Sequence, residues 1–298
     1  MMDRGKEIRN ITLWGSLTNI FLTIFKITAG MLGRSAAMVA DGIHSLSDLL
    51  SDIIVLVFTH ISSKGTDRDH SFGHGKFETL ATLIVSVILV VVGAELMSGG
   101  IRSIVDIING ETIPRPGYIA LIAALISIIL KEILYHATVR IGRKTCSTVV
   151  IANAWHHRSD AFSSIGSLAG IGGAILLGDK WTVLDPLASC LISIAIIVVA
   201  VRMALPSLAE LLEASLPEDI EQEIISIASA VEGVNDIHEL KTRRNGMAFI
   251  IDAHITVNPE ISVIEAHDIS TAVEEAIWER FGQDTQINIH VEPASDAK

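Results

Sequence analysis

Six long apolar stretches constrain the fold of this chain more than any other feature. The stretches lie at residues 11–32, 37–60, 77–106, 117–139, 148–177 and 184–205. A helix needs about 20 residues to cross the hydrocarbon core of a bilayer, and every stretch is near or above that length. Half of the 298 residues are hydrophobic and the mean hydropathy is +0.51, which is too apolar for an ordinary soluble domain. The sequence therefore predicts an α-helical membrane bundle of six transmembrane helices.

The charged residues indicate how these helices are oriented. Lysine and arginine gather at the N-terminus and in the second and fourth connections, namely Arg4, Lys6, Arg9, Lys64, Arg68, Lys76, Arg140, Arg143 and Lys144. Because positive residues favour the cytoplasmic side, we expect both termini in the cytoplasm. Residues 1–10 are charged and run directly into an apolar stretch, which favours a multi-pass protein of the cell inner membrane over a secreted one. The net charge of −12 argues against a nucleic-acid partner, since the sequence has no basic patch to neutralise phosphates.

The composition changes after Pro206, which predicts a transmembrane domain over residues 1–205 and a second domain over residues 206–298. The expected elements are a helix from Pro217 to about Val231, strands Val234–Thr242 and Met247–Val257 joined by a turn at Asn245-Gly246, a helix over Ser262–Phe281 and a strand over Gln286–Val291. The order α-β-β-α-β predicts a small α+β domain with a split ferredoxin-like arrangement.

Two apolar stretches each contain a histidine four residues before an aspartate. The pairs are His44 with Asp48 and His156 with Asp160. On a helix this spacing places both side chains on one face, one turn apart. Ionisable groups are costly inside a membrane and mark functional sites, and two facing pairs would supply two nitrogen and two oxygen ligands for a tetrahedral divalent metal. His157 could also pair with Asp160, but His156 repeats the first pattern and is preferred.

Two further aspartates, Asp41 and Asp52, lie on the same helix face as His44 and Asp48. We expect them to serve as way stations for cations or as partners that orient the ligating imidazoles. The alternative is a polar helix face packed inside the bundle.

Potential ligands also gather outside the apolar stretches. The second connection concentrates Asp67, Asp69, His70 and His74 in a short loop. The second domain holds His238, His254, His267, His290 and Glu292. His290 and Glu292 alternate on one expected strand and therefore face the same way. Exposed loops and surface histidines without a metal are the alternative in both places.

With these motifs in this order, the chain resembles the cation diffusion facilitator family over essentially its whole length. That family comprises proton-coupled metal efflux proteins with six membrane helices and a cytoplasmic, metallochaperone-like domain. The resemblance implies a transport site formed by His44, Asp48, His156 and Asp160. It also implies metal ligands in the loop and in the cytoplasmic domain, namely Asp67, His70, His74, His238, His254, His267 and His290, with Glu292 replacing the family's usual aspartate.

The resemblance further implies a homodimer and an interlock between a basic residue before the third helix and an acidic residue near the cytoplasmic domain. The matching residues are Lys76 and Glu213. The alternative is that Lys76 is an ordinary cytoplasmic-side lysine and Glu213 a solvated residue. The histidine at position 44 resembles the zinc-selective members, whereas bacterial members often carry aspartate there.

We therefore expect a divalent metal/proton antiporter that exports Zn²⁺ from the cytoplasm, with Zn²⁺ also as a regulatory ligand and the proton as counter-ion. His44 and His156 are the expected proton carriers, because imidazole titrates near physiological pH. Efflux of Fe²⁺, Mn²⁺, Co²⁺ or Cd²⁺ by the same mechanism and a non-transporting metal sensor are the alternatives. An intramembrane metalloenzyme is disfavoured, because the chain has no His-Glu-x-x-His motif.

Overall fold

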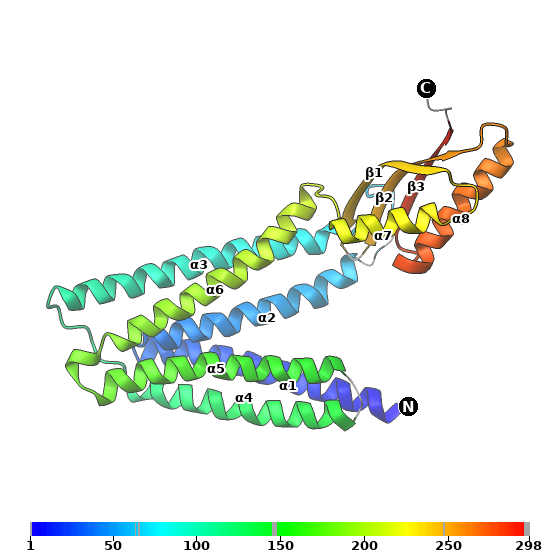
Figure 1. Cartoon of the computed structure of the whole chain (residues 1–298). Helices are drawn as coiled ribbons and strands as arrows, with labels where there is room; N and C mark the ends of the chain where they lie inside the picture. The colour runs from blue at the N-terminus through cyan, green and yellow to red at the C-terminus, as the bar shows by residue number, and fades with distance from the viewer. Residues whose placement is uncertain (1, 63, 65, 145–147, 247, 295–298) are drawn as a thin grey trace. The chain divides into compact units, whose positions relative to one another are not determined.

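The computed structural model describes residues 2–62, 64, 66–144, 148–246 and 248–294 (Figure 1). The helices are α1 Met2–Leu32, α2 Ala36–Ser62, α3 Lys76–Ile108, α4 Tyr118–Lys144, α5 Thr148–Leu176, α6 Leu184–Leu211, α7 Glu218–Ser229 and α8 Val263–Phe281, with a short 3₁₀ helix at Asp179–Trp181. The strands are β1 Asp236–Asn245, β2 Ala248–Val257 and β3 Gln286–Pro293.

The six long helices predicted from the apolar stretches are confirmed as α1 to α6. Among the described residues, four helical segments are long and apolar enough to cross a bilayer, namely Asn10–Leu32, α3, α4 and α6. The other two long helices, α2 and α5, carry the two histidine–aspartate pairs. The apolar stretch expected to end at residue 205 continues as helix through Pro206 to the end of α6.

The chain forms two compact units, one comprising residues up to 53 together with 85–202, the other 54–84 together with 203–298. The predicted domain boundary at 205/206 therefore stays a prediction. In the first unit, α4 packs along both α5 and α1 (Figure 1).

Small side chains dominate one buried cluster in the first unit, where α1, α2, α4 and α5 meet. The cluster includes Ala29, Ala37 and Ala123 together with Ile171. Small residues allow helix backbones to approach closely, which is how membrane helices gain packing energy without a hydrophobic driving force. A second buried cluster joins α2 to α3 and α6 through Ala40, Leu89 and Ile196. The helix α2 takes part in both clusters, so its polar face is held within the bundle.

The second unit contains a three-stranded sheet in the order β1-β2-β3, and the predicted α-β-β-α-β sequence of elements is confirmed. Strands β1 and β2 are antiparallel and are joined at the predicted turn, where Gly246 has a φ of +64°. That left-handed conformation costs glycine little. Strands β2 and β3 are parallel and α8 connects them.

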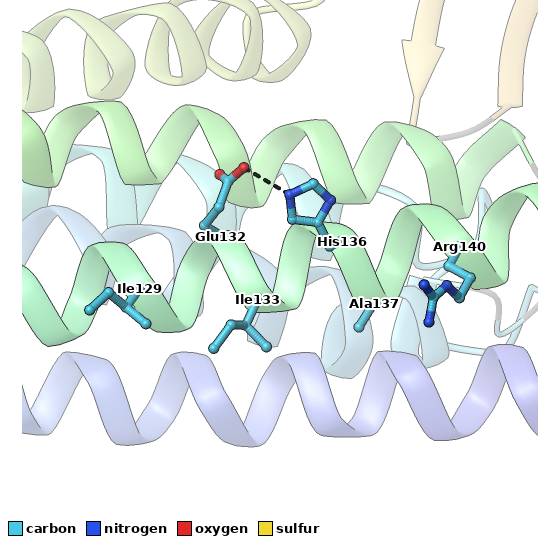
Figure 2. Close-up of a pocket in the computed structure, with 6 residues that line it drawn as sticks. All are labelled: Ile129, Glu132, Ile133, His136, Ala137 and Arg140. Atoms are coloured by element: carbon cyan, nitrogen blue, oxygen red, sulfur yellow. Dashed lines mark ion pairs between the residues drawn. The ribbon is translucent and has the colours of Figure 1, made fainter.

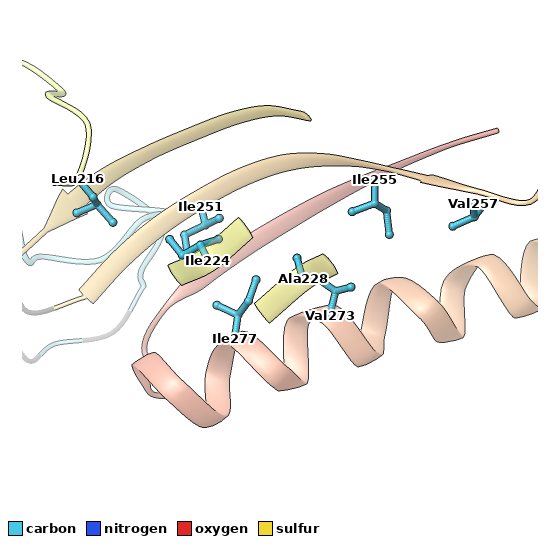
Figure 3. Close-up of a cluster of buried hydrophobic side chains, with 8 residues drawn as sticks. All are labelled: Leu216, Ile224, Ala228, Ile251, Ile255, Val257, Val273 and Ile277. Atoms are coloured by element: carbon cyan, nitrogen blue, oxygen red, sulfur yellow. The ribbon is translucent and has the colours of Figure 1, made fainter. Parts of the chain in front are cut away.

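Both α7 and α8 cover one face of this sheet, as Figure 3 shows. Ile224 of α7 and Ile277 of α8 pack against Ile251 and Ile255 of β2 in a fully buried core. Side chains alternate between the two faces of a strand. His254, which precedes Ile255 and points to the opposite face, is therefore left on the face that the helices do not cover.

Candidate metal centres

Three ligand groups from α2 and α5 converge inside the membrane bundle. The ligand atoms of His44, Asp48 and Asp160 all lie within 4.8 Å of one another. Asp160 is buried, while His44 and Asp48 are half-buried. The two helices thus bring together one imidazole and two carboxylates, and within α2 the i, i+4 spacing puts His44 and Asp48 on one face.

The imidazole of His44 has an unused ring nitrogen. Its Nδ1 is buried and has no hydrogen-bond partner among the described residues. A buried polar atom without a partner is costly, and such an atom in a native site calls for a missing ligand or water. An imidazole with an unpartnered buried nitrogen beside two carboxylates fits a metal cation as the transported substrate.

The two histidines of α5 occupy different environments. His156 is half exposed, and its Nδ1 lies 3.9 Å from Asp160 Oδ1. His157 is 2% exposed, and neither of its ring nitrogens has a partner among the described residues. It faces α1, where a Cβ built on Gly15 would lie 3.4 Å from His157 Nε2. The geometry therefore brings His156 next to Asp160, while the ligand role of both histidines stays a prediction.

Asp41 lies in a closed polar network away from these ligands. It forms a 2.8 Å ion pair with Lys26, and both side chains are buried. The hydroxyls of Ser163 and Ser164 donate to its two carboxylate oxygens at 3.1 and 2.9 Å. The predicted roles of Asp41 as a way station or orienting partner are untested, and the side chain of Asp52 lies outside the described residues.

Two buried lysines were missed in the sequence interpretation. Lys26 pairs with Asp41, and Lys131 of α4 donates to Asp160 at 2.7 Å. The sequence does contain a signal, because Lys26 is the only charged residue in the stretch 11–32. A lone lysine inside a membrane helix requires a partner carboxylate or a polar cavity.

The connection between α2 and α3 brings its three expected ligands together. The ligand atoms of Asp67, His70 and His74 lie within 4.8 Å of one another. The Asp67 carboxylate is 3.5 Å from His70 Nδ1 and 3.3 Å from His74 Nε2. Backbone N–H groups of His70 and Asp69 donate to this carboxylate and hold the pKa of Asp67 below its usual range. These hydrogen bonds favour the ionised form of Asp67, which is the form that a metal ion requires.

The same loop contacts the β1–β2 hairpin and the residues that follow α6. Lys76 forms an ion pair with Glu213, the interlock that the family resemblance implies. Glu213 also accepts from Arg243 of β1 at 2.7 Å, a partner that no local sequence pattern predicts. Hydrogen bonding to Lys76 lowers the pKa of Glu213, and Arg243 adds to that effect. The backbone carbonyl of Phe72 accepts from Asn245 Nδ2 at 2.7 Å.

The uncovered face of the sheet carries three histidines in a row. His238 pairs with His254 across β1 and β2, and His254 pairs with His290 across β2 and β3. The carboxylate of Glu292 approaches all three, at 3.1 Å from His254 Nδ1, 3.3 Å from His238 Nε2 and 3.6 Å from His290 Nε2. The longer reach of glutamate is thus compatible with a ligand position. A hydrogen bond from His254 lowers the pKa of Glu292, and the charges of His254 and His238 lower it further.

The fifth expected ligand of this domain, His267, is exposed on α8 and lies outside the cluster formed by His238, His254 and Glu292. Two other carboxylates approach the histidines instead. Asp236 Oδ2 is 3.5 Å from His238 Nδ1, and Glu239 Oε2 is 3.9 Å from His254 Nε2. Strand β1 has a bulge between His238 and Lys241, and Glu239 within it has a φ of +48°. The bulge interrupts the alternation of side chains, so the approach of Glu239 to His254 could not be predicted from strand alternation alone.

A hollow of about 490 Å³ lies along α4 and is lined by Ile129, Glu132, Ile133, His136, Ala137 and Arg140 (Figure 2). Within this lining, Glu132 Oε1 lies 3.2 Å from His136 Nε2, and the same oxygen lies 3.7 Å from the guanidinium of Arg158. None of the residues of the intramembrane ligand cluster lines it. One carboxylate and one imidazole on a mostly apolar surface do not form a metal site.

Comparison with known proteins places this geometry in a family. The family described as "Cation efflux transmembrane domain" matches residues 13–212, and the one described as "Cation efflux protein, cytoplasmic domain" matches residues 216–294. Six membrane helices that hold an ionisable ligand cluster and carry this second domain define a metal cation efflux transporter. The chain belongs to the cation diffusion facilitator family, as the resemblance of its motifs predicted.

Individual relatives align along most of the chain. Manganese efflux system protein MneP of Bacillus subtilis is 32% identical and covers 98% of both chains. Metal tolerance protein C1 of Arabidopsis thaliana is 35% identical over 97% of this chain, which spans 63% of the length of that relative. Magnetosome protein MamM of Paramagnetospirillum magneticum is 30% identical over 95% of this chain and 88% of its own.

The lowered pKa of Glu292 predicts how the stability of the isolated cytoplasmic domain depends on pH. A carboxyl group whose pKa is lower in the folded state than its ordinary 4.5 adds stability above that value, and this stability is lost as the pH falls through the lowered pKa. In metal-free protein, Glu292→Gln should therefore reduce the free energy of unfolding at neutral pH, with the difference from wild type shrinking at low pH. Denaturant titrations across the pH range measure this difference. A difference that does not change with pH would contradict the assignment.

The interlock predicts a partial charge-swap rescue. Lys76→Asp places a carboxylate beside Glu213 and should impair metal flux, and adding Glu213→Lys should restore part of it. Restoration should be incomplete, because the new lysine lies beside Arg243. An exposed ion pair contributes only about 0–1 kcal/mol, so the effect should appear in transport more than in stability. Flux in proteoliposomes at matched protein levels tests this, and a double variant no better than the single one rejects the coupling.

Proposed function

We propose that this protein exports Zn²⁺ from the cytoplasm in exchange for protons, through a transport site formed by His44, Asp48, His156 and Asp160. The observation that supports this most directly is the convergence of one imidazole and two carboxylates within 4.8 Å inside a membrane bundle. Ionisable groups at such a place mark ion pathways. His156, whose Nδ1 is 3.9 Å from Asp160, would complete a tetrahedral set of two nitrogens and two oxygens.

The ligand chemistry supplies the coupling to protons. Metal binding requires neutral imidazole and ionised carboxylate, so protons compete with the metal for the same atoms. When the site is open to the cytoplasm it binds metal and releases protons. When it is open to the opposite side, protons displace the metal. Rocking of helices against one another around the site alternates the access, and His44 and His156 carry the protons.

The proposal extends to the assembly and to regulation. The protein acts as a homodimer in the inner membrane with both termini in the cytoplasm, in keeping with the positive charge of the connections on that side and with the cytoplasmic domain of the family. The loop cluster and the histidine row of the sheet, with Glu292, act as regulatory Zn²⁺ sites. Metal bound there would draw the loop, the strands or two copies of the domain together.

Manganese is the second candidate substrate. A relative named as a manganese efflux protein aligns with 98% of this chain. The three ligands that already converge include two carboxylates and only one imidazole, and oxygen-rich sites suit Mn²⁺. The discriminating feature is whether His156 joins the bound ion, because a second imidazole favours zinc.

Removing either carboxylate of the transport site should abolish metal flux. Asp48→Asn and Asp160→Asn each exchange an anionic ligand for a neutral amide of nearly the same shape. Asp160→Asn also leaves the buried Lys131 without its carboxylate, so the folded state of each variant is verified before flux is compared. Flux of Zn²⁺ and Mn²⁺ into proteoliposomes, together with the accompanying pH change, measures the loss. Glu132→Gln on α4 is the matched control, because it removes a carboxylate of the bundle that lies outside the ligand cluster. Normal flux in a folded Asp48→Asn variant would refute the site.

The imidazole at position 44 should determine the choice of metal. His44→Asp replaces a nitrogen ligand by a hard oxygen and should broaden the substrate range toward Mn²⁺ and Cd²⁺. Competition between these ions and Zn²⁺ in the flux assay measures the change. An unaltered competition profile would show that another feature of the site sets selectivity.

A further inference from the structure

The charge of Lys131 is held directly against the transport site. Its Nζ lies 2.7 Å from Asp160 Oδ2, and both side chains are more than nine-tenths buried. The other oxygen of the same carboxylate faces His156. A buried ion pair persists only when each charge has its partner, and removing one partner leaves an uncompensated charge. In this state the lysine therefore supplies the positive charge that Asp160 needs.

A second acceptor for the lysine lies close by. The Oδ1 of Asn19, on α1, accepts from Lys131 Nζ at 2.9 Å. A lysine ammonium has three rotatable donors on a flexible stem, so it can keep one acceptor while it leaves another. Asn19 is a neutral side chain, and a metal ion bound at Asp160 does not remove it as an acceptor.

The second buried lysine, Lys26, differs from Lys131 in that its carboxylate partner is not one of the clustered metal ligands. Lys26 pairs with Asp41 and also donates to the hydroxyls of Ser45 and Ser164. Its carboxylate partner lies outside the ligand cluster. That network is closed and involves no metal ligand, so it holds helices together. Of these two lysines, Lys131 on α4 is the one whose carboxylate partner, Asp160, belongs to the ligand cluster.

We propose that Lys131 is an internal counter-cation of the transport site, which neutralises Asp160 when no metal is bound and is displaced onto Asn19 when a divalent cation takes that carboxylate. The inference rests on the proposed transport function and assigns a positioning role within it. A lysine and a divalent cation on the same carboxylate would repel each other and compete for one anion. The lysine therefore weakens metal binding and speeds release.

Transport kinetics in proteoliposomes test this with the full-length protein, and Zn²⁺ and Mn²⁺ serve as the probes. Lys131→Met keeps the length of the side chain and removes the charge. The KM should fall by about tenfold or more, because the competitor is gone, and the maximal rate should fall with slower release. Lys131→Arg, which keeps the charge, should restore a KM close to that of wild type. Lys26→Met is the control for a general loosening of the bundle and should not lower the KM.

Asn19→Leu should change the KM in the opposite direction, and it leaves the ion pair between Lys131 and Asp160 in place. Without its second acceptor the lysine should hold Asp160 more firmly, so the KM should rise. The double variant Asn19→Leu/Lys131→Met should match Lys131→Met alone, because Asn19 acts through the lysine. A higher KM in the double variant would make Asn19 itself a metal ligand and overturn the exchange.

An unchanged or raised KM in folded Lys131→Met protein overturns the proposal, as does an equal fall in Lys26→Met. If Lys131→Met does not fold, Asn19→Leu alone decides, and an unchanged or lowered KM rejects the exchange. Absence of flux in the wild-type protein would instead refute the transport function, and this inference would fall with it.

Discussion

The cost of placing charge inside a membrane bundle is the constraint on which the rest of this structure depends. Asp41 on α2 and Asp160 on α5 are buried carboxylates, and each needs a compensating positive charge. Two buried lysines meet that need, Lys26 beside Asp41 and Lys131 beside Asp160. Because these pairs join α1 to α2 and α4 to α5, charge compensation also fixes which helices are neighbours. The small residues between the helices then allow the close approach that such short ion pairs require.

The sheet of the second unit is under a different constraint, because polar side chains on an exposed sheet face can be solvated by water. Its sheet buries only one face, against α7 and α8, and the opposite face is free to carry polar side chains. The register of the three strands then determines which polar side chains are neighbours on that face. His238, His254 and His290 lie in one row across three strands, and Glu292 approaches all of them. A ligand cluster on a rigid sheet is held more accurately than one on a loop, so this cluster and the loop cluster near Asp67 can respond differently to the same metal.

Much of this could be predicted because the responsible signals are local. Apolar length identified six membrane helices, and period-two and period-3.6 patterns with turn residues identified the order of elements after α6. The four-residue spacing placed His44 and Asp48 on one face of α2. In contrast, the partner of Lys131 lies 29 positions along the chain, and the partner of Glu213 on β1 lies 30 positions away. Pairings over such distances depend on helix packing and strand register, which no local pattern encodes.

The sequence alone determined the membrane bundle, the α+β domain and the types of ligand available, because chain length in hydrocarbon and side-chain periodicity leave few alternatives. The tertiary structure decided which of those ligands meet. It turned His157 toward α1, since two adjacent residues of a helix point in different directions and only the neighbouring helix determines what His157 meets, whereas the four-residue spacing within α5 already places His156 beside Asp160. It also left His267 on α8, outside the row of histidines, because α8 packs on the opposite face of the sheet. The packing of helices and the pairing of strands, which act between distant parts of the chain, made these choices.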